Sequence, residues 1–166
     1  MSLVSAPQRL PGGKELLLAL ERERTAIVGA AVESLRHSRT HYGSASEAEI
    51  RQPIESLYDE LLAAVARRDL GDVIDYARDV AAERFRLGYD LSEVQAAINT
   101  LEEATWSTLC AQLEPEHLAL SLGLVSTIFG AAKDALAQAY VSLAAGTHAP
   151  SLDLRALFTG GTVGSS

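Results

Sequence analysis

The chain has 166 residues, of which 48% are hydrophobic and 22% are charged, as in one globular domain and unlike a disordered or fibrous protein. Its net charge of -8 argues against nucleic-acid binding, because nucleic-acid-binding domains usually present a basic face to phosphates. The single cysteine, Cys110, cannot form an internal disulfide, and this favours a reducing compartment. We therefore expect a cytoplasmic domain that does not bind nucleic acid.

The N-terminal part predicts a leader followed by one helix. Residues 1–13 lack the apolar core of a signal peptide, and we expect them to form a flexible leader. From Lys14 to about Arg39 apolar residues recur at helical spacing, which predicts a first helix, and Gly43 ends this segment. The residues of this stripe are Leu17, Leu20, Ile27, Ala31 and Leu35.

A capping box predicts the start of a second helix. Ser46 is followed three residues later by Glu49, and a one-faced apolar pattern then runs to Val65. Pro53 lies within this pattern. Either the first turn is a separate short piece, or Pro53 stands in the first helical turn, where its missing N–H costs nothing.

Two further helices are predicted around a glycine. Asp69 is expected to cap a third helix, which ends at Gly88. Asp90 and Glu93 form a second capping-box pair, and the fourth helix that they begin extends to about Leu113.

The fifth predicted helix begins at Pro115 and is unusually apolar. Its uncharged run, Leu118 to Ala132, is shorter than the ~20 residues that a bilayer requires, so we expect no membrane insertion. Such a helix requires burial on most sides, in a domain core or in a homodimer seam. The residues that we assign to the seam are Val125, Phe129, Ala132, Leu136 and Tyr140.

These elements predict an all-α, single-domain bundle of about five helices over residues 14–145, in which the fourth and fifth helices form a long antiparallel hairpin. Residues 146–166 are rich in Pro, Gly and Ser and predict a linker or tail. A short amphipathic turn is expected in this tail around Leu154, Leu157 and Phe158.

Residues that bind metals or perform catalysis are sparse. His37 and His41 have the i, i+4 spacing of half a metal site, and Glu114 with His117 has the spacing found in di-iron bundles. Neither pair has the further ligands that such sites need, and no nucleophile elbow or phosphate-binding glycine loop is present. We therefore predict no catalytic residue, no metal ligand and no cofactor, and no enzymatic activity.

A ligand pocket between helices is the alternative to a pure interaction module. Trp106, Phe85 and Tyr89 are the aromatic residues that we expect to line such a pocket. A protein of this alternative class binds a small molecule of haem type or a lipid. No histidine has the mid-helix, apolar position that an axial haem ligand requires, which argues against haem itself.

The residues Ala82–Val94 (AERFRLGYDLSEV), followed by Ile98, Leu101 and Trp106, resemble the N-terminal sensor domain of RsbR/RsbRD-type stress-response co-antagonists. The resemblance spans about residues 14–145. In that family an arginine, a glycine with an aromatic residue, and a leucine-initiated helix link two helices. The matching positions here are Arg84, Gly88, Tyr89 and Leu91.

This resemblance implies a non-catalytic sensor module with a globin-like fold that lacks haem. It also implies a homodimer that passes a signal to a protein partner or to an output domain outside these 166 residues. We expect the fourth and fifth helices to form the dimer and to shift between two packings when a signal arrives.

Overall fold

The computed structural model describes residues 13–148, and every regular element in this range is an α-helix. The predicted all-α class is confirmed, but the described range contains seven helices where about five were expected. The helices are α1 (Gly13–Arg22), α2 (Arg24–Arg36), α3 (His41–Ser44), α4 (Glu47–Arg67), α5 (Gly71–Arg86), α6 (Leu91–Gln112) and α7 (Pro115–His148).

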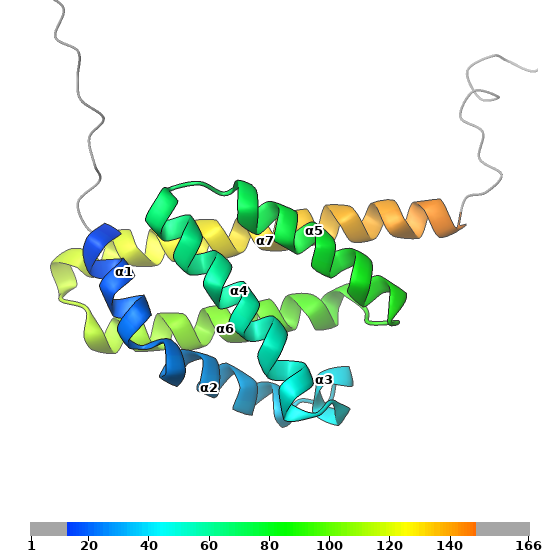
Figure 1. Cartoon of the computed structure of the whole chain (residues 1–166), viewed down its shortest axis with the longest axis horizontal. Helices are drawn as coiled ribbons and strands as arrows, with labels where there is room; N and C mark the ends of the chain where they lie inside the picture. Colours follow the sequence, from blue (N-terminus) through cyan, green and yellow to red (C-terminus); the bar gives the residue numbers. More distant parts are fainter. Residues whose placement is uncertain (1–12, 149–166) are drawn as a thin grey trace, which may run out of the picture.

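The predicted first helix is divided into α1 and α2, and a hydrogen bond from α4 explains the division. The hydroxyl of Tyr58, which is fully buried, donates to the Leu20 carbonyl at 2.7 Å. In a continuous helix this carbonyl would accept the N–H of Arg24. The chain therefore changes direction near Glu23, and α1 and α2 lie at an angle to each other (Figure 1).

The end of this first region also differs from the prediction. The helix ends at Arg36, and Gly43 lies in the short helix α3. A side chain at Gly43 would overlap with the backbone carbonyl of Ser38, so the residue permits a close approach of two backbone segments. Thr40 begins α3, and its hydroxyl accepts the N–H of Tyr42 at 3.3 Å.

Both predicted capping boxes are confirmed. In α4 the Ser46 hydroxyl accepts from the Glu49 N–H at 3.2 Å while the Glu49 carboxylate accepts from the Ser46 N–H at 2.7 Å. Asp90 and Glu93 form the same reciprocal pair at the start of α6. Pro53, however, lies in the interior of α4, so both alternatives offered for it are wrong.

The core lies where α7 crosses the other helices. α7 packs against α5 and α6, with further contacts to α4 and α1, and α4 crosses over α6 (Figure 1). Lys133 on α7 is held by α6, since its ammonium donates to Glu102 at 2.8 Å and to Asn99 at 2.9 Å. The globin-like relationship stays a prediction. Most of the predicted leader and the turn around Leu154, Leu157 and Phe158 lie outside the described residues.

Candidate functional site

The turn between α5 and α6 joins the four positions of the sequence motif. Gly88 has a φ of 84°, a left-handed conformation that glycine adopts without steric cost. The N–H of Tyr89 donates to the carbonyl of Arg84 at 3.0 Å, and the N–H of Gly88 donates to Phe85 at 3.1 Å. These two bonds define a Schellman helix end. Leu91 then begins α6 and packs against the core.

The Arg84 side chain lies between two tyrosine rings. Its guanidinium carbon is 4.9 Å from the ring centre of Tyr89 and 5.7 Å from that of Tyr42, which is the geometry of a cation–π pair. Within residues 13–148, Arg84 forms no ion pair and its guanidinium makes no hydrogen bond with another residue. The charge is therefore stabilised by aromatic faces and leaves its N–H donors free.

Three tyrosines near Arg84, namely Tyr42, Tyr76 and Tyr140, stay protonated over the physiological range. Burial raises the pKa of Tyr42 to about 12, and the nearby Arg84 charge opposes this only in part. Burial likewise raises the pKa of Tyr76 to about 12 and also raises that of Tyr140. The Tyr140 hydroxyl donates to the carbonyl of Tyr89 at 3.0 Å, so α7 is attached directly to the α5–α6 turn.

A polar clamp attaches α3 to the same turn. The Nδ1 atom of His41 lies 2.7 Å from one carboxylate oxygen of Glu93 and 2.9 Å from the other. Glu93 also accepts the backbone N–H of Asp90 at 3.0 Å, and these bonds lower the pKa of the Glu93 carboxyl, the Asp90 bond most of all. The His41 ring packs against Tyr89 with the ring centres 5.0 Å apart.

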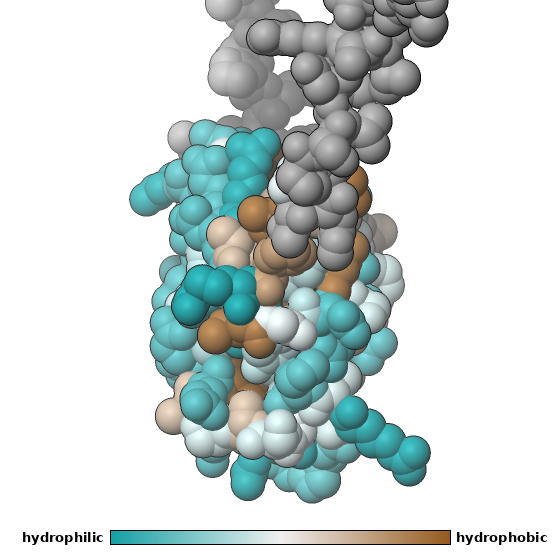
Figure 2. All heavy atoms as spheres, turned by 90° about the vertical axis from the view of Figure 1, so that its right-hand side faces the viewer, coloured by the Kyte–Doolittle hydropathy of each residue, from teal (hydrophilic) through white to brown (hydrophobic). Residues whose placement is uncertain are grey.

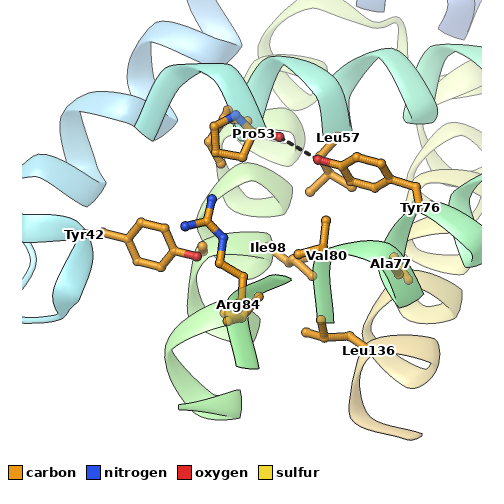
Figure 3. Close-up of a pocket in the computed structure, with 13 residues that line it drawn as sticks. Tyr42, Pro53, Leu57, Tyr76, Ala77, Val80, Arg84, Ile98 and Leu136 are labelled. Atoms are coloured by element: carbon orange, nitrogen blue, oxygen red, sulfur yellow. Dashed lines mark hydrogen bonds between the residues drawn. The ribbon is translucent and has the colours of Figure 1, made fainter. Parts of the chain in front are cut away.

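An apolar cavity opens beside Arg84. It leaves about 40 Å³ for the centres of water-sized atoms, several times the ~10–15 Å³ that one water molecule requires. Figure 3 shows Arg84 extending from α5 toward Pro53, with Tyr42 on one side and apolar side chains on the other. The lining residues are Tyr42, Pro53, Ile54, Leu57, Tyr76, Ala77, Val80, Arg84, Val94, Ala97, Ile98, Ala132 and Leu136.

The model of the family described as RsbT co-antagonist protein rsbRD N-terminal domain matches residues 25–149, about three quarters of the chain. The chain belongs to this family. The predicted resemblance is thereby confirmed, and the RsbRD N-terminal family is one of stress-response signalling modules associated with RsbT and is not a known enzyme family. No match was found among curated proteins.

The aromatic residues predicted to line a pocket do not line this cavity. Phe85 packs edge-on against Tyr140, with ring centres 5.7 Å apart, and Tyr89 stacks near Tyr42 and His41. Trp106 is 39% exposed and borders an open hollow on α6. The actual cavity depends on small residues where helices cross, and the alanines at these positions were a signal that we did not use.

The predicted seam residues are core residues. Val125, Phe129, Ala132, Leu136 and Tyr140 are all 6% exposed or less within the single chain. They are buried where α7 packs against the other helices of its own molecule, and they offer almost no surface to a second copy. A stripe in a sequence shows that a helix face is buried, but it does not show whether the same chain or another one buries it.

The opposite face of α7 is exposed and consists largely of small or apolar residues. Leu120 is 44% exposed and Val141 is 66% exposed. We call this surface the outer face; its exposed residues are Glu116, Ala119, Leu120, Gly123, Thr127, Asp134, Gln138, Val141 and Ala145. Hydrophobic residues also gather in a band over the end of the molecule where α3, the α5–α6 turn and the C-terminal part of α7 lie (Figure 2).

The composition of α7 has a second implication. Between Pro115 and Gly146 the helix is long and apolar enough to cross a membrane, and one third of its most apolar window is buried in the fold. Core helices of soluble proteins meet the same criteria. The predicted absence of membrane insertion therefore stays a prediction.

The candidate metal residues lie apart. His37 contacts the backbone carbonyl of Glu33, His41 contacts Glu93, and His117 lies 3.4 Å from Glu116. No group of three or more metal-binding side chains occurs among the residues that the structure describes. Cys110 is exposed on α6 and forms no disulfide.

Proposed function

We propose that this protein is a non-catalytic input module of RsbT co-antagonist signalling, which works as a homodimer in the cytoplasm and regulates a protein partner or an output domain. Membership of the RsbRD N-terminal family supports the signalling role. The free and exposed Cys110 is consistent with a reducing compartment.

The observation that carries the homodimer is the composition of the outer face of α7. Seven of its nine exposed positions are uncharged, and Glu116 and Asp134 are the exceptions. Gly123 and Thr127, one turn apart, leave a flat surface on which a second helix can approach closely. In an acidic chain that exposes many charged side chains elsewhere, such a surface is expected to be covered by a partner.

The same helix connects this surface to the candidate site. Ala132 and Leu136, on the inner face of α7, line the cavity, and Tyr140 bonds to the α5–α6 turn. A change at the site therefore acts on the helix that we assign to the dimer. Signalling then consists of a shift between two packings of α7 against α5 and α6.

The test compares two threonine variants by light scattering coupled to size-exclusion chromatography. Thr127→Arg places a large cation on the outer face, and Thr25→Arg places the same side chain on an exposed position of α2. We expect the native chain and Thr25→Arg to be dimers and Thr127→Arg to be a monomer with unchanged helical circular dichroism.

A monomeric native chain, or a Thr127→Arg variant that remains a dimer, would overturn the assignment of the outer face to the dimer. Flotation with anionic lipid vesicles separates this proposal from membrane insertion. We expect the native chain to stay with the soluble fraction, because the inner face of α7 is occupied by α5 and α6.

A further inference from the structure

The cavity beside Arg84 has the composition of a site for a small amphiphile. Three alanines, Ala77, Ala97 and Ala132, lie where α5, α6 and α7 meet, and their short side chains leave the space open. The walls are apolar apart from Arg84 and the tyrosine hydroxyls. A pocket with apolar walls and a few polar groups at one side orients a ligand that has an apolar body and one polar end.

The charge of Arg84 indicates which polar group a ligand of this cavity carries. The chain has 22 acidic and 14 basic residues other than histidine, so a guanidinium can readily find a carboxylate partner. Other arginines do so: Arg24 pairs with Asp59 at 2.6 Å, and Arg67 pairs with Asp72 at 2.6 Å. Arg84 forms no such pair within the described residues although it is half-buried. Its N–H donors therefore remain available to an anion that enters the cavity.

We propose that this cavity binds a small amphiphilic carboxylate, with its apolar body among Leu57, Ile98 and Leu136 and its carboxylate on the guanidinium of Arg84. The planar fork of the guanidinium matches a carboxylate in a bidentate pair. One cation balances one negative charge, which favours a monoanion over a phosphate dianion. The size of the cavity limits the body to a short chain or a single small ring.

The aromatic neighbours prepare Arg84 for this role. The faces of Tyr42 and Tyr89 hold the guanidinium in place without using its N–H donors. Both the Tyr42 and Tyr76 side chains remain neutral near pH 7, because burial raises each pKa to about 12. The incoming carboxylate therefore meets one positive charge and no negative charge from Tyr42 or Tyr76.

The experiment uses four compounds that differ in head or tail. Hexanoate, 1-hexanol and hexylamine share one chain length and differ in the charge of the head, and acetate has the head of hexanoate without its tail. Binding to the complete chain is measured by titration of ¹H–¹⁵N and methyl NMR signals, which also locates the ligand. We expect hexanoate to bind about 10- to 100-fold more tightly than 1-hexanol, because charge-assisted hydrogen bonds discriminate by this factor. Hexanoate is also expected to bind more tightly than acetate, which has no apolar chain to bury. Hexylamine is expected to bind most weakly.

Two arginine variants assign the effect to one side chain. Arg84→Gln removes the charge in the cavity, and Arg86→Gln removes an exposed charge from the same last turn of α5. We expect Arg84→Gln to bind hexanoate and 1-hexanol equally, whereas Arg86→Gln retains the preference of the native chain. Ala97→Leu, which fills the cavity, is expected to weaken binding of both compounds.

The proposal is overturned if hexanoate and 1-hexanol bind equally to the native chain, if neither shifts the signals of Leu57, Ile98 and Leu136, or if Arg84→Gln retains the preference. If Arg84→Gln does not fold, the comparison of hexanoate with 1-hexanol on the native chain and on Ala97→Leu decides the question. Binding is measured at the cavity itself, so its outcome is independent of the dimer proposed above.

Discussion

Two half-buried cations, Lys133 on α7 and Arg84 on α5, are stabilised in different ways. Lys133 is enclosed by α6, where Glu102 and Asn99 accept its hydrogen bonds. Arg84 lies on two tyrosine rings and pairs with no described carboxylate. The ion pair of Lys133 stabilises the packing of α7 against α6. The aromatic contacts of Arg84 leave its N–H groups available to hydrogen-bond a ligand. The kind of partner, and not burial alone, separates a structural charge from a functional one.

The largest change in the free energy of unfolding is expected when Lys133 is replaced. Lys133→Met leaves the Glu102 carboxylate, whose side chain is only 18% exposed, without its cation, so the free energy of unfolding should fall by about 2 kcal/mol. Urea denaturation measures this loss. The double variant Lys133→Met/Glu102→Gln should recover part of it, because no carboxylate is then left unpaired. Equal stability of the single variant and the native chain would contradict the structural role of Lys133.

The next largest effect is expected at the turn that positions Arg84. Gly88→Ala forces a residue with a side chain into a left-handed conformation, which should cost about 1–2 kcal/mol. The matched control is Gly29→Ala in α2, where nothing lies within 4 Å of the added methyl group. This control should stabilise the fold by about 0.5–1 kcal/mol. Thermal denaturation of the pair should thus give shifts of opposite sign.

A smaller loss of stability is expected when Arg84 is replaced. Arg84→Met gives up the two cation–π contacts but leaves no described carboxylate unpaired, so we expect a cost of about 0.5–1 kcal/mol, less than for Lys133→Met. If urea denaturation gave Arg84→Met the greater loss, the distinction between the two cations would fail.

The smallest effect is the dependence of the α3 clamp on pH. Hydrogen bonds from Asp90 and His41 hold the pKa of Glu93 below its ordinary value of 4.5. The stabilisation is therefore complete above the unfolded pKa and is lost as the pH falls through the folded one. We expect the protection of the α3 amides, measured as their exchange rates relative to those of an unstructured chain at the same pH, to fall below about pH 4.5, and to fall less in Glu93→Gln, which already lacks the carboxylate. A native chain whose α3 protection does not change on acidification would contradict this role of Glu93.

Local signals predicted several helix ends, because these depend on residues close in sequence, although Gly43 does not end the first region as expected. Ser46 with Glu49, Asp90 with Glu93, Gly88 and Pro115 each mark a boundary that the structure contains. The division of α1 from α2 was not predictable in this way. It depends on Tyr58, which reaches the Leu20 carbonyl from another helix.

The candidate site was predictable only in part. The sequence motif located Arg84, Gly88 and Tyr89, but the cavity beside Arg84 arises from where three helices cross. Trp106, chosen for its aromatic ring, lies on the surface, because residue type alone does not fix which way a helix turns its faces. The five residues assigned to the seam were correctly predicted to be buried, but other helices of the same chain bury them, and not a second copy.

The Schellman bond at Arg84 has a mechanical consequence. The backbone carbonyl of Arg84 closes the turn by accepting the Tyr89 N–H, while its side chain reaches the cavity. Tyr89 in turn accepts from Tyr140 on α7 through its own carbonyl. A displacement of the Arg84 guanidinium would therefore act within one residue on the turn between α5 and α6, and through one further hydrogen bond on α7. Gly88, at the centre of this turn, is the point about which the end of α5 would move.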